Sequence, residues 1–130
     1  MTYLLDTHTL IWFLRNPAGL PRLTRELIEE ESTMLAVSLA TPWEMSIKTA
    51  IGRLDAEDIV DDFESVLVRG RIRLLVPTVA HVIRSGRLPL YHRDPFDRLI
   101  AAQTLDLGWS LISKDAVFDA YGVRRIWGQA

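Results

Sequence analysis

The sequence contains no cysteine. This absence excludes a disulfide framework and every metal site built on thiolates, so a bound metal would need oxygen or histidine ligands. The sequence also lacks any apolar run close to the roughly 18 residues that a membrane span needs. Its first residues, MTYLLDTHTL, carry no basic segment before the apolar run. We therefore expect no signal peptide, no membrane association and a cytoplasmic protein.

The sequence also lacks a strong excess of either charge, because the formal net charge is only −2 at pH 7. This value neither indicates nor excludes a nucleic-acid partner. Lysine is scarce, since Lys48 and Lys114 accompany thirteen arginines. Arginine suits bidentate contact with phosphate. A GC-rich genome explains the same bias better, so the arginine content is weak evidence for nucleic-acid binding.

The chain has 130 residues and is 48% hydrophobic, which fits one domain with its own core. No repeat or low-complexity tract divides it, so we predict a single domain over residues 1–130. Short apolar runs predict buried strands, and the segments between them predict helices. We expect strands at Tyr3–Leu5, Met34–Val37, Ile72–Val76, Trp109–Ile112 and Val123–Trp127, and helices at Thr9–Arg15, Pro21–Glu31, Thr41–Gly52, Asp55–Arg69, Thr78–Gly86, Asp94–Gly108 and Asp115–Tyr121.

This alternation of strands and helices predicts an α/β fold. We expect a central, mostly parallel sheet of four to five short strands, covered by helices on both faces. In such sheets, ligands bind beyond the carboxyl ends of the strands.

Four acidic residues lie at the junctions between the expected elements: Asp6, Glu44, Asp97 and Asp115. Two of them follow strands, and the other two lie near the starts of helices. Strand ends and helix starts share one edge of a parallel sheet, so the fold would gather the four carboxylates. Such a cluster repels itself, and a hard divalent cation such as Mg²⁺ or Mn²⁺ would stabilise it.

Helix capping offers a competing explanation for each acid. Asp6 and Asp115 fit N-cap positions. Thr41, followed three residues later by Glu44, predicts a capping box. Lys48 lies four residues after Glu44 and is expected to pair with it on the helix. Taken singly, these acids are explained as well by capping as by metal binding, or better.

Asp97 lies in a helix start with two acids. Asp94 fits the N-cap, Pro95 the first helical position and Asp97 the third. Two carboxylates in one turn are more than capping needs, which favours a functional role for one of them.

Four segments carry a resemblance to a known family: LLDTHTLIWFL (4–14), VSLATPWEMSIKTAIGRL (37–54), HRDPFDRLIAAQ (92–103) and LISKDAVFDAYGV (111–123). In this order they resemble a PIN-domain nuclease, and most closely the VapC-type toxin of bacterial type II toxin–antitoxin pairs. The resemblance covers essentially the whole chain. The combination of HRDPFDR with DTHTLIW is more specific than any single acid.

The resemblance implies a three-layer PIN-like fold and a ribonuclease that uses one or two Mg²⁺ or Mn²⁺ ions. It also implies an RNA substrate, a homodimer and inhibition by a cognate antitoxin. The family's catalytic and metal-binding acids carry over to Asp6, Glu44, Asp97 and Asp115, with Asp6 and Asp97 as the expected direct ligands. Ser113 matches a small hydroxyl residue of the family motif, and Asp94 is expected to cap its helix or to support the ligands.

Basic residues and histidines surround the acids in the sequence. Three basic residues could hold RNA phosphates or neutralise the pocket, and the residues leave both readings open: Arg93, Arg98 and Lys114. No histidine is assigned to the metal. His8 is expected to pack or cap locally, His81 to be structural, and His92 to brace the loop before Asp94.

The helix after Asp6 is unusually apolar, with Leu10 to Leu14 contiguous. One part of it must face the core. The rest is either buried as well or covered by a second chain, which would be a twin subunit or an antitoxin segment in a groove.

Two other enzyme classes with acidic pockets fit less well. A haloacid-dehalogenase-like phosphatase needs a second Asp at the position of His8. A receiver domain needs an acceptor Asp after a central strand, where Val37 is followed by Ser38-Leu39-Ala40. A solitary PIN-fold nuclease of RNA processing and a non-catalytic metal- or RNA-binding module of the same fold stay open.

Overall fold

The computed structural model describes residues 1–128. The strands are β1 (Thr2–Leu5), β2 (Met34–Ser38), β3 (Ile72–Leu75), β4 (Ser110–Ile112) and β5 (Arg124–Ile126). The α-helices are α1 (Thr7–Arg15), α2 (Arg22–Glu29), α3 (Ala40–Ala50), α4 (Glu57–Asp61), α5 (Phe63–Arg69), α6 (Val79–Arg87) and α7 (Pro95–Leu107). Two 3₁₀ helices, η1 (Pro17–Gly19) and η2 (Ala116–Tyr121), complete the set for this part of the chain.

Most elements lie where the sequence predicts them, but the single helix expected over Asp55–Arg69 is wrong. Two short helices, α4 and α5, occupy this segment, because Asp62 leaves the helical region with φ −126° and ψ 31°. Ile59 and Phe63 on either side of this break are both buried in the core.

The five strands form one parallel sheet in the order β3-β2-β1-β4-β5. Leu5 lies opposite Val37 of β2 on one side and opposite Ile112 of β4 on the other. Strands β1 and β4 therefore end at the same level, one residue before the end of β2 at Ser38. The chain builds outward from β1 through β2 to β3 and then returns to the other side of β1 with β4. This reversal makes the junction of β1 and β4 the switch point where ligands bind in such sheets.

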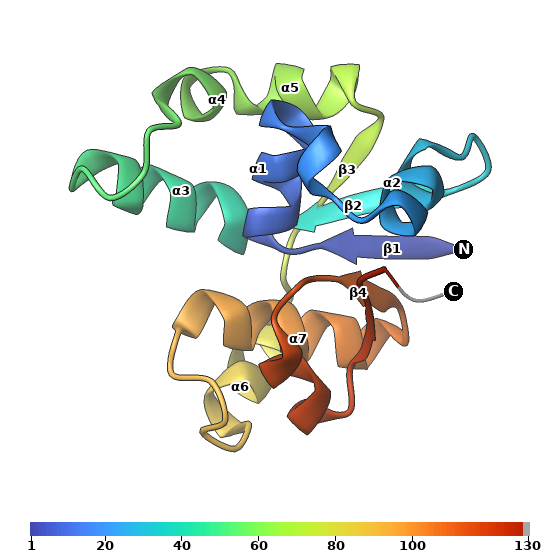
Figure 1. Ribbon diagram of the computed structural model, residues 1–130. Helices are drawn as coiled ribbons and strands as arrows, with labels where there is room; N and C mark the ends of the chain where they lie inside the picture. The colour runs from blue at the N-terminus through green and yellow to red at the C-terminus, as the bar shows by residue number, and fades with distance from the viewer. Residues whose placement is uncertain (129–130) are drawn as a thin grey trace.

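Helices cover both faces of the sheet. Figure 1 shows α1, α2, α4 and α5 above the strands, and α6 and α7 below them. The expected three-layer α/β fold is thus confirmed.

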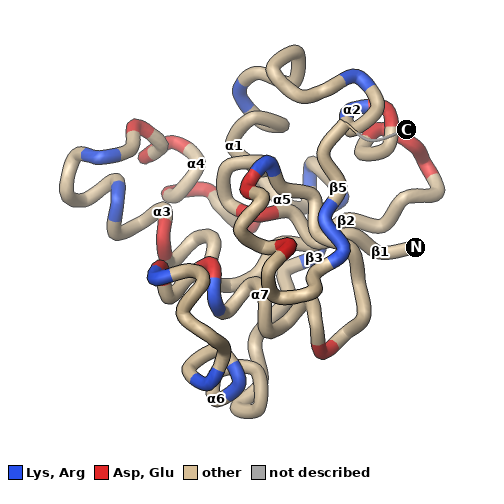
Figure 2. Tube along the Cα trace, turned by 60° about the horizontal axis from the view of Figure 1, so that its bottom comes forward, with Lys and Arg blue, Asp and Glu red and all other residues tan. Residues whose placement is uncertain are grey.

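The surface carries both signs of charge. Figure 2 shows acidic and basic residues interspersed along the trace, in agreement with the nearly balanced composition. Within residues 1–128, no helix has the length and apolar character to cross a membrane.

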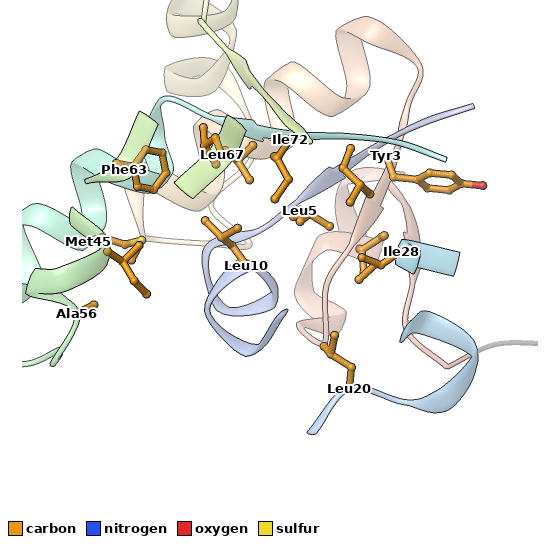
Figure 3. Packing of buried hydrophobic residues seen from close by; sticks show 14 residues of the cluster. Tyr3, Leu5, Leu10, Leu20, Ile28, Met45, Ala56, Phe63, Leu67 and Ile72 are labelled. Carbon is orange, nitrogen blue, oxygen red and sulfur yellow. The ribbon is translucent and has the colours of Figure 1, made fainter. Parts of the chain in front are cut away.

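Two hydrophobic clusters pack against the two faces of the sheet, because alternate residues of a strand point to opposite sides. Leu5, Val37 and Ile112 face the cluster with Leu10 of α1 and Phe63 of α5, part of which Figure 3 shows. The second cluster combines alternate strand residues with side chains of α7 and η2: Leu4, Ala36 and Leu111 with Leu99, Ile100, Ala101 and Phe118. Strand β1 is thus buried on both sides.

We expect Leu4→Ala to lower the free energy of unfolding by about 2–5 kcal/mol, because it leaves a cavity beneath a central strand. Leu74→Ala on the edge strand β3 is the matched control, since Leu74 is 37% exposed and should lose much less. Urea denaturation measures both. Equal losses in the two variants would contradict the assignment of β1 to the centre of the core.

Candidate metal centre

Asp6 lies at the switch point, directly after β1, and is 5% exposed. It is the N-cap of α1, where its Oδ1 accepts a hydrogen bond from the Thr9 amide at 2.9 Å. Its Oδ2 accepts a short hydrogen bond from the hydroxyl of Ser113, which follows β4. Capping therefore uses one oxygen of Asp6, and the other lies against the neighbouring strand end.

Ser113 connects two of the predicted acids. Its hydroxyl donates to Asp6 and accepts the backbone N–H of Asp115 at 3.0 Å. Asp115 in turn caps η2, where its Oδ1 accepts the Val117 amide at 3.0 Å. The Ser113 hydroxyl thus joins the carboxylate of Asp6 to the backbone of Asp115.

The expected capping box of Thr41 and Glu44 is wrong. Helix α3 begins at Ala40, and the Ser38 hydroxyl accepts its first free amide at 3.0 Å. The Thr41 hydroxyl instead bonds that of Thr7 at 3.1 Å. Glu44 consequently lies in the second turn, where capping does not explain it.

Glu44 is 2% exposed, and only one of its two carboxylate oxygens has a partner within residues 1–128. The Lys48 ammonium contacts its Oε2 at 2.5 Å, which confirms the expected pair. Its Oε1 is buried and has no hydrogen-bond partner within residues 1–128. A buried carboxylate oxygen without a partner is costly, so this atom suits an external ligand.

Asp94 and Asp97 have different roles at the start of α7. The Oδ1 of Asp94 accepts the amides of Phe96 at 2.8 Å and Asp97 at 3.4 Å, as expected for an N-cap before Pro95. The carboxylate of Asp97 is therefore free of any capping role.

The electrostatics place Asp97 among the other acids. Burial, followed by the charge of Asp94, raises the pKa of Asp97 to about 7. Glu44 and Asp6 also raise its pKa, while His92 opposes the shift. Burial likewise raises the pKa of Asp6, although hydrogen bonds from Ser113 and Thr9 oppose this. These like-charge effects mark one acidic pocket.

His92 is the site residue that sequence reasoning missed. Its Nε2 lies 2.7 Å from Oδ2 of Asp115 and 3.4 Å from Oδ2 of Asp97. Atoms of these three residues form a group with mutual distances within 4.8 Å, compatible with a metal ion. The sequence held one usable signal, because His92 lies two residues before the cap of the helix that carries Asp97.

Arg98 is a correction to the expected RNA-binding residues. It is 7% exposed, and its guanidinium donates to the carbonyls of Leu88, Pro89 and His92 at 2.8, 3.1 and 3.2 Å. A buried guanidinium whose donors hold a loop is not available to RNA phosphates. Arg93 and Lys114, by contrast, are exposed.

Two hollows flank the acids on either side of the exposed His8. One, of about 260 Å³, is lined by Asp6, His8, Trp12, Lys114 and Asp115. The other, of about 250 Å³, is lined by Thr7, His8, Ile11, Glu44, Lys48, Arg53 and Leu54. Basic groups thus border the pocket on both sides.

The remaining histidine has a structural role, as expected. His81 completes a capping box with Thr78 at the start of α6, and its Nε2 contacts Asp106 at 2.9 Å.

The PIN domain family model matches residues 3–123. The chain belongs to the PIN domain family. PIN domains are generally nucleases and typically use divalent metals. A search of curated proteins finds no relative of the chain.

Solved structures share the fold over nearly the whole chain. The structure of VapBC-1 from nontypeable Haemophilus influenzae is 22% identical with a TM-score of 0.71, covering 98% of both chains. VapBC2 from Rickettsia felis, bound to a DNA fragment from their promoter, is 13% identical with a TM-score of 0.71, covering 98% of this chain and 99% of that one. FitAcB from Neisseria gonorrhoeae is 18% identical with a TM-score of 0.57, covering 95% and 96%.

The donor set fits a divalent cation. The group whose ligand atoms lie within 4.8 Å of one another combines the carboxylates of Asp97 and Asp115 with the imidazole of His92. Asp6 and Glu44, with its unpartnered buried Oε1, lie outside this group. Carboxylates suit Mg²⁺ and Mn²⁺. The like charges around Asp97 provide the negative potential that such an ion would neutralise.

The raised pKa of Asp97 predicts a pH dependence in metal-free protein. Its pKa is about 7 when folded, against an ordinary value of 3.8, so the folded state binds this proton more tightly. Its contribution to stability is therefore full below about pH 4 and is lost as the pH rises toward 7. Asp97→Asn should remove this loss.

Urea denaturation in EDTA at pH 5 and pH 8 measures this effect. We expect the Asn variant to gain stability relative to the parent protein on going from pH 5 to pH 8. A stability difference that is the same at both values would show that Asp97 titrates normally.

Proposed function

We propose that the protein is a divalent-metal-dependent endoribonuclease of the VapC type, the toxin of a toxin–antitoxin pair. One observation carries the nuclease proposal: Asp97 forms a group with His92 and Asp115 that is compatible with a metal ion. Burial, together with the charges of Asp94, Glu44 and Asp6, raises the pKa of Asp97, which supports the same proposal. A buried cluster of carboxylates does not stabilise a fold, since each charge disfavours the ionisation of the others. It is a good site for one or two Mg²⁺ or Mn²⁺ ions and a phosphodiester.

In this proposal, Asp6 and Asp97 hold the cation directly, and Glu44 and Asp115 contribute directly or through water. When bound, the metal would supply an activated water and stabilise charge on the phosphoryl oxygens. Ser113 and the Thr9 amide orient the Asp6 carboxylate.

The surrounding residues have supporting roles. The cap formed by Asp94 fixes the first turn of α7 and so the position of Asp97. Lys48 holds one oxygen of Glu44. The exposed Arg93 and Lys114 border the acids and would bind RNA phosphates, with the Lys114 ammonium 5.7 Å from the Trp12 ring centre.

Asp6→Asn and Asp97→Asn should each reduce RNA cleavage to background, because each removes a ligand charge while keeping the side-chain shape. Asp61→Asn is the matched control, since Asp61 is exposed on α4. Cleavage of a total RNA preparation with Mg²⁺ or Mn²⁺, and with EDTA, measures the effect. Full activity in either site variant would sink the ligand assignment, and absence of cleavage in the parent protein would favour a non-catalytic binding module.

The toxin assignment draws on the likeness to VapBC and FitAB structures and on the family resemblance of the sequence. A groove fits the antitoxin segment. It has a volume of about 610 Å³ between α1 and the α4–α5 pair, with apolar and charged walls: Phe13, Leu14, Arg15, Asp58, Ile59, Val66, Arg69 and Gly70. In this proposal, the second chain that covers the apolar surface of α1 is the antitoxin.

A different face suits the homodimer. Exposed apolar residues gather on α6 and the segment before it, including Val76, Val79, Val82 and Ile83. A hollow beside them is lined by Leu39, Ala40, Trp43, Pro77, Val82 and Leu99. A contiguous apolar patch is the kind of self-complementary surface that a two-fold dimer buries.

Val79→Asp should convert the dimer to a monomer, because Val79 is 75% exposed and a charge there opposes burial in an interface. Val66→Glu, in the groove, should leave the dimer intact and weaken antitoxin binding. Sizing chromatography with light scattering at micromolar concentration, with and without the product of the adjacent reading frame, separates the two effects. A parent protein that runs as a monomer would refute the dimer.

A further inference from the structure

We propose that His92 is a nitrogen ligand of the catalytic cation and that it gives the site a preference for Mn²⁺ over Mg²⁺. This inference rests on the proposed metal-dependent function and deepens it, because it concerns which ion the same pocket selects. It also replaces the expectation that no histidine belongs to the metal.

The spacing of the ligand atoms fits one ion. Two donors in neighbouring octahedral positions, each about 2.1 Å from a metal, lie roughly 3 Å apart. The Nε2 of His92 lies 2.7 Å from Oδ2 of Asp115 and 3.4 Å from Oδ2 of Asp97, on either side of that value. An ion between the three atoms would need only small shifts.

The imidazole is held in place from three directions. The backbone N–H of His92 donates to the Tyr121 hydroxyl at 2.8 Å, and its carbonyl accepts from Arg98 at 3.2 Å. The ring packs against the buried Phe118, with ring centres 5.4 Å apart. A side chain on an anchored loop that faces two carboxylates has the preorganisation that a metal ligand requires.

A second anchor shows that the loop itself is fixed. The Tyr121 hydroxyl also donates to the Pro89 carbonyl at 2.7 Å, and Arg98 donates to the carbonyls of Leu88 and Pro89. The residues just before His92 are therefore tied to both η2 and α7. The backbone of His92 cannot leave the pocket without breaking these contacts, and rotation of its ring would lose the packing against Phe118.

A further observation supports an external ligand at this edge of the sheet. The Oε1 of Glu44 is buried without a partner within residues 1–128, although Glu44 lies outside the group of His92, Asp97 and Asp115. A histidine that served only as a counter-charge to Asp97 and Asp115 would leave this oxygen unexplained.

The nitrogen determines which ion is favoured. Carboxylates suit both Mg²⁺ and Mn²⁺, whereas imidazole is a ligand of first-row transition metals and not of Mg²⁺. Mn²⁺ belongs to that transition series and is the member that a carboxylate-rich site also accepts. Replacing one oxygen position by Nε2 should therefore strengthen Mn²⁺ binding relative to Mg²⁺.

The test uses Mn²⁺ itself as the probe. Pulsed electron paramagnetic resonance of the Mn²⁺-loaded protein should show coupling to nitrogen, and growth with ¹⁵N-histidine should change that coupling without any substitution. His92→Ala should abolish the signal, whereas His8→Ala, which removes the other histidine near the acids, should keep it. The experiment with ¹⁵N-histidine uses the unsubstituted protein, so it gives a result even if a variant fails to fold.

Calorimetry with Mn²⁺ and Mg²⁺ gives a second readout. His92→Ala should weaken Mn²⁺ binding by about tenfold or more and Mg²⁺ binding by less, so the preference shrinks. Equal losses for both ions, or bound Mn²⁺ without histidine coupling in a protein that still cleaves RNA, would overturn the proposal for His92 alone. A parent protein that binds neither ion would overturn the metal-dependent function as well.

Discussion

The register of the three central strands is the constraint on which the site depends. Leu5 is level with Val37 and with Ile112, so β1 and β4 end at one height and β2 ends one residue later, at Ser38. The next residues, Asp6, Ser38 and Ser113, consequently occupy one edge. Each then acts there: Asp6 caps α1, Ser38 accepts the first amide of α3, and Ser113 donates to Asp6. A slip of one residue in any pairing would turn these side chains to the wrong face.

Burying carboxylates at this edge opposes stability, because burial raises the pKa of both Asp97 and Asp6. For Asp97, the charges of Asp94, Glu44 and Asp6 add repulsion to this effect. The fold offsets the repulsion locally. The amides at the start of α1 and α7 bind Asp6 and Asp94, Lys48 holds Glu44, and favourable helix dipoles add to this. The offset is incomplete, because the Oε1 of Glu44 has no partner within residues 1–128. A buried carboxylate oxygen without a partner is costly, which supports the proposed binding of a cation.

Interactions between residues close together in the sequence could be predicted, whereas interactions between distant residues could not. The cap Asp94-Pro95 and the Glu44–Lys48 pair involve residues two to four positions apart, and the sequence was sufficient to predict them. The capping box at Thr41 failed because α3 begins at Ala40, whose amide is bound by Ser38 of the preceding strand, and because the Thr41 hydroxyl bonds that of Thr7. Arg98 was misjudged for the same reason, because its donors hold a loop folded back over α7. The position of His92 likewise depends on a distant residue, Tyr121, 29 residues away.

The short helix η2 connects Asp115 with the loop that carries His92, two regions whose contact the sequence did not predict. Its N-cap is Asp115, its buried Phe118 packs against the ring of His92, and Tyr121 at its end binds the backbone of His92 and of Pro89. One 3₁₀ helix thus positions a carboxylate of the pocket and, through the loop, the imidazole beside it. Because Phe118 is fully buried in the same cluster as Ile100 of α7, the packing of the lower layer sets the separation of His92, Asp115 and Asp97. The geometry of the candidate metal centre is therefore a property of the core beneath it.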